Sequence, residues 1–88
     1  MIRIYSDELV VLAKRKRTFR GTPIAEITAE ATMRGKPKEV TVCFYGEKAD
    51  EAMEKLIPGV RFTFRGANTI DEETGSLQMA AATFAVIA

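Results

Sequence analysis

One segment of the chain, residues 40–66, constrains the fold more than any other. It reads VTVCFYGEKADEAMEKLIPGVRFTFRG, and apolar and polar residues alternate at both of its ends, as they do along a half-buried strand. Between these ends, apolar residues recur at the spacing of one helix face, at Ala49, Ala52, Met53 and Leu56. A proline and a glycine then stop the helical pattern. The segment therefore predicts a strand, a helix over residues 47–57 and a second strand in direct succession.

Three further strands are predicted from the remaining sequence, at residues 2–16, 23–33 and 77–87. The connections include two loops rich in Lys and Arg, at residues 14–23 and 34–38, and an acidic turn at residues 68–76. A helix between the third and fourth of five strands is the connectivity of the OB-fold, a partly open all-β barrel. An SH3-like barrel lacks this helix, and a ferredoxin-like fold needs two. We therefore expect residues 1–88 to form a single five-stranded OB-fold domain with one short helix between strands 3 and 4.

Composition excludes several classes of function. No apolar run approaches the ~20 residues of a membrane-spanning helix, and the charged N-terminal sequence is unlike a signal peptide. Cys43 is the single cysteine, so it forms no internal disulfide, and we expect a cytoplasmic protein. There is no histidine, no second cysteine for a metal site and no phosphate-binding loop motif. We expect no enzymatic activity, no metal or other cofactor, no small-molecule substrate and no membrane partner.

Charge is distributed unevenly along the chain. Residues 1–38 contain nine basic and four acidic residues, a net charge of +5, and residues 39–88 contain four basic and eight acidic residues, a net charge of −4. Such a pattern can steer an anionic ligand, or a second copy of the protein, to one region of a nearly neutral molecule. Both loops flank the ligand groove of an OB-fold, so we expect their cations to converge there on phosphates, namely Lys14, Arg15, Lys16, Arg17, Arg20, Arg34, Lys36 and Lys38.

Binding of single-stranded nucleic acid also needs aromatic faces on which bases can stack. Tyr45 falls on the outward face of its strand, and Phe19 lies between two arginines, where a core residue is unexpected. The other phenylalanines are predicted to be core residues, namely Phe44, Phe62, Phe64 and Phe84. Glu26 and Glu30 argue against a polyanionic ligand, because they also face outward and would repel phosphates unless basic neighbours neutralise them.

The ordered set of motifs resembles the bacterial-type single-stranded-DNA-binding proteins over roughly residues 21–86. The matching pieces are a glycine-led second strand, Tyr45-Gly46, Ala49-Asp50, Leu56 to Gly59, Gly66, and Asp71 to Gly75. The resemblance implies an OB-fold, a stacking role for Tyr45 and a role in DNA replication, repair and recombination. The chain departs from the family in having no tryptophan, and no acidic tail follows the last strand before Ala88, so recruitment of partners through such a tail is not expected.

Two functions remain open from the sequence. The first is sequence-independent binding of single-stranded DNA, with RNA as a variant, by a homo-oligomer that combines a basic groove with aromatic stacking. The second is an OB-fold interaction or oligomerisation module with little nucleic-acid binding. The missing tryptophans and the outward glutamates favour the second. Only the first predicts an affinity that falls steeply with salt.

Overall fold

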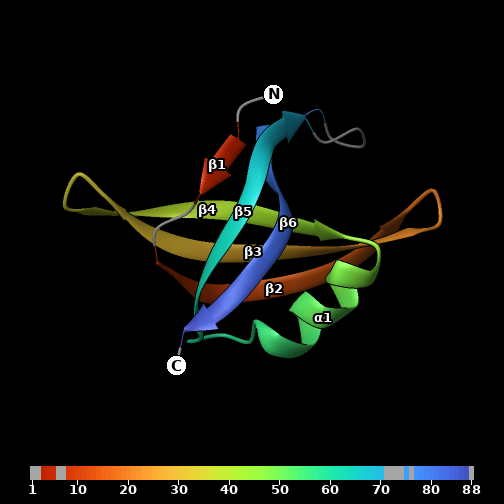
Figure 1. Cartoon of the computed structure of the whole chain (residues 1–88), viewed down its shortest axis with the longest axis horizontal. Coiled ribbons are helices and arrows are strands. Elements are labelled where there is room, and N and C mark those ends of the chain that lie inside the picture. The colour runs from red at the N-terminus through yellow and green to blue at the C-terminus, as the bar shows by residue number, and fades with distance from the viewer. Residues whose placement is uncertain (1–2, 6–7, 71–74, 76, 88) are drawn as a thin grey trace.

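The computed structural model describes residues 3–5, 8–70, 75 and 77–87, in six strands and one helix (Figure 1). These elements are β1 (Arg3–Tyr5), β2 (Leu9–Phe19), β3 (Thr22–Met33), β4 (Lys36–Tyr45), α1 (Glu47–Lys55), β5 (Arg61–Ile70) and β6 (Leu77–Ile87). β1 and β2 both pair with β5, and they use the edge of β5 that is not paired with β6. They are therefore two parts of the single first strand that the sequence predicts. The predicted helix lies between the third and fourth strands of this count.

The strands close into a barrel. β2, β3 and β4 form an antiparallel meander, β4 pairs in parallel with β6, and β6 pairs antiparallel with β5. The ring is completed by β5 and β2, which pair at only two positions, Leu9 with Phe62 and Val10 with Arg61. This five-stranded closed barrel confirms the predicted OB-fold.

The two basic segments are not loops, and that prediction was wrong. β2 continues to Phe19 and β3 begins at Thr22, so the first hairpin turns within Arg20-Gly21. The second hairpin turns within Arg34-Gly35. Both residues of each turn have positive φ, with 51° and 80° in the first turn and 54° and 76° in the second, as the tightest hairpin turns require. The hairpins project in opposite directions along the longest axis of the molecule (Figure 1).

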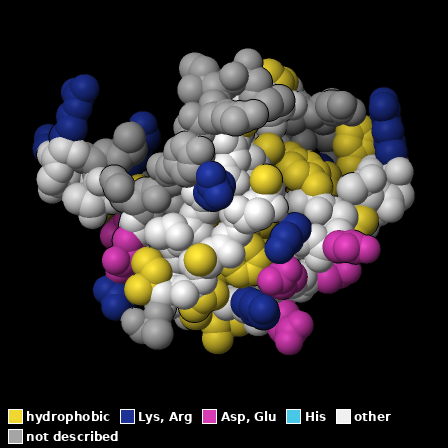
Figure 2. Space-filling model, in the orientation of Figure 1, with side chains coloured by type: hydrophobic (Ala, Val, Ile, Leu, Met, Phe, Trp, Pro, Cys, Tyr) yellow, Lys and Arg dark blue, Asp and Glu magenta, His cyan; other side chains and the backbone are white. Residues whose placement is uncertain are grey.

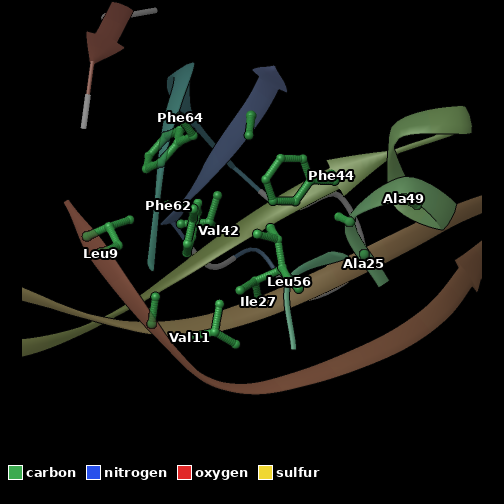
Figure 3. Packing of buried hydrophobic residues seen from close by; sticks show 13 residues of the cluster. Leu9, Val11, Ala25, Ile27, Val42, Phe44, Ala49, Leu56, Phe62 and Phe64 are labelled. Carbon is green, nitrogen blue, oxygen red and sulfur yellow. The ribbon is translucent and has the colours of Figure 1, made fainter. Parts of the chain in front are cut away.

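The alternation of residues correctly predicts the inward faces. The fully buried side chains of β3 are Ala25, Ile27 and Ala29, and they pack against Val42 and Phe44 of β4. Phe62 and Phe64 of β5 fill the opposite wall (Figure 3). Phe84 is only partly buried, but it packs on this core with its ring edge-on to Phe44, at a centroid distance of 5.2 Å.

Helix α1 covers one end of the barrel with the predicted apolar stripe. Ala49 and Leu56 are fully buried (Figure 3), as is Ala52, and Met53 packs against the same cluster. The helix is two residues shorter than predicted. On the outer side of the helix, Glu51 accepts hydrogen bonds from Lys48 and Lys55. These bonds lower the pKa of the Glu51 carboxyl group, and the bond from Lys48 is the main cause.

Gly66 lies at a close approach between β5 and β6. A register shift lies between Arg65 and Gly66, where β5 bends across its neighbour. A Cβ atom at Gly66 would lie 2.1 Å from the carbonyl oxygen of Ala80 and 2.8 Å from Cα of Ala81. Only glycine fits at this crossing.

The first three residues of the predicted acidic turn belong to a strand. Asn68, Thr69 and Ile70 belong to β5 and pair with β6, so the strand is longer than its alternating apolar part. The acidic residues 71–74 lie outside the described residues.

Candidate nucleic-acid interface

The outward face of β2, β3 and β4 presents residues in aligned rows. Strand pairing places Arg17, Ile24 and Tyr45 in one row across the three strands. The next row, two residues further along each strand, contains Arg15, Glu26 and Cys43. Paired residues of neighbouring strands lie on the same face, so these side chains share one surface.

A pocket of about 330 Å³ opens at one end of this face. Its lining comes from the first hairpin, the end of β4 and the ends of β5 and β6: Phe19, Arg20, Thr22, Ile24, Tyr45, Thr69, Ile70 and Ala80. Figure 2 shows hydrophobic side chains gathered beside this hairpin. The two aromatic residues proposed from the sequence for stacking, Phe19 and Tyr45, thus lie in the same pocket. Its volume is at the lower end of the ~300–1,000 Å³ found for small-ligand sites.

Tyr45 is held in the pocket by a chain of hydrogen bonds from β6. The side-chain amide of Gln78 donates from Nε2 to the Tyr45 hydroxyl at 3.1 Å. The buried thiol of Cys43 donates to Oε1 of the same glutamine, also at 3.1 Å. Sequence reasoning missed Gln78. The amide of Gln78 in a mostly apolar last strand was the available signal. Its neighbour across the barrel, however, depends on the β4–β6 pairing.

Phe19 has a cationic neighbour in the turn. The guanidinium carbon of Arg20 lies 5.0 Å from the centre of the Phe19 ring, a cation–π contact. Arg20 therefore places positive charge at the rim of an aromatic pocket.

Two of the predicted cations point away from this face. Lys14 and Lys16 pair with inward residues of β3 and extend toward α1. Nζ of Lys14 donates to the carbonyl oxygen of Met53 at 2.6 Å, and Nζ of Lys16 lies 2.7 Å from Oδ1 of Asp50. The structure does not bring these two lysines to the pocket.

Arg15 and Arg17 do lie on the outward face, and both bind Glu26. Nη2 of Arg15 is 3.2 Å from the Glu26 carboxylate, and Nε of Arg17 contacts the other carboxylate oxygen. Glu26 is thus neutralised by basic neighbours, the condition under which an outward glutamate is compatible with a polyanion.

The remaining predicted cations are remote from the pocket. Arg34, Lys36 and Lys38 lie on the second hairpin, at the opposite end of a molecule 38 Å long, so the eight cations do not converge. Basic side chains are visible at both ends of the long axis (Figure 2). These three side chains are exposed, and among the described residues none of them forms an ion pair.

Acidic residues separate the two basic ends. Glu30 of β3 pairs directly with Glu39 of β4, and both are exposed. Like charges directly opposite each other destabilise a strand pair. The outward face is therefore interrupted by negative charge between the pocket and the second hairpin.

The described residues contain neither a metal-binding cluster nor a membrane-spanning helix. No group of three or more His, Cys, Asp or Glu side chains that could hold a metal ion was found in residues 3–5, 8–70, 75 and 77–87. In the same part of the chain, no helix has the length and apolar character needed to cross a bilayer.

Solved structures share the fold over nearly the whole chain. The SSB domain of a Synechococcus protein superposes with a TM-score of 0.76 at 21% identity, covering 96% of this chain and 93% of the other. The second single-stranded-DNA-binding protein of Mycobacterium smegmatis gives 0.76 at 15% identity, with 96% and 86% covered. The small single-stranded-DNA-binding protein of Streptomyces coelicolor gives 0.72 at 16% identity, with 98% and 92% covered.

No protein-family model and no curated protein sequence matches the chain. The resemblance predicted from the sequence is confirmed at the level of the fold, which this chain shares with domains of single-stranded-DNA-binding proteins.

Proposed function

We propose that this OB-fold protein binds single-stranded DNA without sequence preference, holding a base in the pocket and phosphates on arginines beside it. The observation that carries the proposal is that Tyr45, Phe19 and Arg20 line one pocket on the outward face of the barrel. This is the face, next to the hairpin between the first two barrel strands, on which OB-folds bind oligonucleotides. Every base has a π-face, so stacking of this kind is sequence-tolerant, at roughly 1–3 kcal/mol per base.

The proposal differs from the sequence-based one in where the charge acts. Arg15 and Arg20 lie at or next to the pocket, whereas Lys14 and Lys16 are bound to α1. The exposed cations of the second hairpin would contact a strand only after it passes the acidic pair of Glu30 and Glu39. One barrel thus offers a short path, and we propose that several copies act together as a homo-oligomer.

The test is a titration of a fluorescently labelled thymidine oligonucleotide, followed by anisotropy at low and at moderate salt. Wild-type protein should bind, and the affinity should fall with salt because phosphate contacts release counterions. Tyr45→Ala and Phe19→Ala should each weaken binding about fivefold or more, since each removes a stacking face. Thr41→Ala, on the outward face of β4 outside the pocket, is the control and should bind as the wild type does. Absence of binding by the wild type at low salt would exclude the proposal.

A second function is favoured by the contacts of the basic residues on β2 with other groups of the protein. All four from Lys14 to Arg17 contact protein groups, and two carboxylates interrupt the outward face. An OB-fold interaction or oligomerisation module would explain this. Its self-association or partner binding would depend little on salt, and the oligonucleotide would not bind at all.

The choice of nucleic acid and the cellular setting are further parts of the proposal. A competition between thymidine and uridine oligomers of equal length distinguishes DNA from RNA, because stacking and charge alone do not recognise the 2′-hydroxyl. We propose that the protein acts in the cytoplasm on single strands exposed during replication, repair or recombination. The solved structures that share its fold come from proteins named for single-stranded-DNA binding.

A further inference from the structure

Glu26 occupies a position where a phosphate would compete with it. It is the direct strand partner of Arg15 and lies diagonally opposite Arg17, and it contacts both guanidinium groups. A carboxylate and a phosphate present similar oxygen acceptors to arginine. Two arginines that could bind a phosphate are therefore already paired with an anion of the protein itself, the carboxylate of Glu26.

The two arginines differ greatly in exposure. The Arg15 side chain is 72% exposed, whereas those of Arg17 and Glu26 are 14% and 20% exposed. The pair of Arg17 and Glu26 is thus less accessible to water and to ligands than Arg15 is. An ion pair as exposed as that of Arg15 is weakly held, because water and salt screen it.

The cluster lies next to the pocket. Arg15 and Glu26 form the row adjacent to the row of Ile24 and Tyr45, both of which line the pocket. Two residues along a strand correspond to about 7 Å. A phosphate attached to a nucleotide whose base is in the pocket can therefore approach Arg15 without crossing the acidic pair further along the face.

We propose that Glu26 is a competitor built into the DNA-binding face: Arg15 leaves it for a backbone phosphate, while Arg17 stays and keeps the carboxylate paired. The inference rests on the proposed function and deepens it. A partly buried carboxylate without a partner would cost free energy. Because Arg17 remains paired with Glu26 when Arg15 moves to the phosphate, this cost does not arise. Glu26 thereby weakens binding to single strands, and the phosphate contact made by Arg15 adds to the salt dependence of that binding.

The experiment compares four proteins on a thymidine oligonucleotide over a range of salt concentrations: wild type, Glu26→Gln, Arg15→Gln and the double variant. Glu26→Gln should bind about twofold to fivefold more tightly at low salt, as expected from removing one weak ion pair. In the Arg15→Gln background the same change should have almost no effect. Arg15→Gln alone should reduce the slope of log K against log salt by about 0.7, the value for one phosphate contact on a single strand.

Glu30→Gln is the matched control. It removes the same charge from the same face of β3 but pairs with Val10, away from Arg15. On an oligonucleotide too short to reach the acidic pair of Glu30 and Glu39, a general electrostatic gain would appear equally in Glu30→Gln and would persist in the Arg15→Gln background. Either result would overturn the inference. If Glu26→Gln is unfolded, the salt slope of Arg15→Gln tests the inference instead. If Arg15 stays on Glu26 when DNA binds, its replacement leaves the slope of log K against log salt at the wild-type value, and the inference is overturned. Failure of the wild type to bind would instead overturn the proposed function itself.

Discussion

Gln78 of β6 donates a hydrogen bond to the hydroxyl of Tyr45 of β4, across the only parallel strand pair in the described part of the barrel. Because the same amide accepts from the thiol of Cys43, its orientation is fixed at both ends. The ring that we propose for stacking is therefore held in place by a neighbour 33 residues away in sequence. A ring fixed before binding loses less conformational entropy when a base arrives.

Replacing this glutamine should loosen the ring. We predict that Gln78→Leu weakens binding to a thymidine oligonucleotide about twofold to fivefold, which is the loss of one modest hydrogen bond. Tyr45→Phe should weaken it to a similar extent, and the double variant should be no weaker than either single one, since both remove the same bond. The affinities of the two single variants and the double variant are measured by anisotropy. If the losses from Gln78→Leu and Tyr45→Phe add up in the double variant, Gln78 does not act through the Tyr45 hydroxyl.

Gly66 is predicted to be intolerant of any side chain. Gly66→Ala should lower the free energy of unfolding by about 3 kcal/mol or more, because its Cβ would collide with the backbone of Ala80, which cannot move as a flexible side chain can. Urea unfolding followed by circular dichroism measures the change. Ala85→Gly is the control on the neighbouring strand, and its cost should be only about 0.5–1 kcal/mol. A Gly66→Ala protein as stable as the wild type would mean that the crossing is looser than described.

The second hairpin turn offers a stabilising substitution. Arg34 has a φ of 54°, a conformation that asparagine adopts more readily than arginine. We predict that Arg34→Asn raises the free energy of unfolding by a few tenths of a kcal/mol to about 1 kcal/mol. Arg34→Val should lower it, because a β-branched side chain is strained at positive φ. The same sign for both variants in thermal unfolding would contradict this account of the turn.

The lysines on the two hairpins should behave differently. Lys14→Gln and Lys16→Gln should leave the affinity for a thymidine oligonucleotide within about twofold of the wild-type value, because both lysines are directed toward α1. Their effect should be a loss of stability of up to about 1 kcal/mol.

Lys36→Gln and Lys38→Gln should leave stability unchanged and reduce the salt slope by up to about 0.7 each on oligonucleotides long enough to reach the second hairpin. On short oligonucleotides confined to the pocket they should have no effect. A large loss of affinity for the Lys14 or Lys16 variant would place DNA on the face of β2 that contacts α1.

The alternation of residues predicted the fold well, because burial on one face of a strand is a local property of the sequence. It correctly placed Ala25, Ile27 and Ala29 inward and put Tyr45 on the outward face. The helix stripe was equally clear, since Ala49, Ala52 and Leu56 need no distant information to define one face.

The basic segments form strands although their charge is typical of loops. Strands that extend beyond a barrel expose both faces, so a run such as Lys14 to Arg17 is compatible with β-structure. Which of these cations are free depends on contacts with Glu26, Asp50 and Met53, which lie 9 to 39 residues away. Register and helix placement decide these contacts, and neither is encoded in the local pattern.

The position of β6 has a consequence for biosynthesis. It pairs with β4 on one edge and β5 on the other, so both strands keep an unpaired edge until this last element in chain order has left the ribosome. A nascent chain that ends before residue 77 therefore has only an open sheet, and the barrel cannot close until β6 has emerged. Until then the edges of β4 and β5 that β6 covers are open to pairing with other chains.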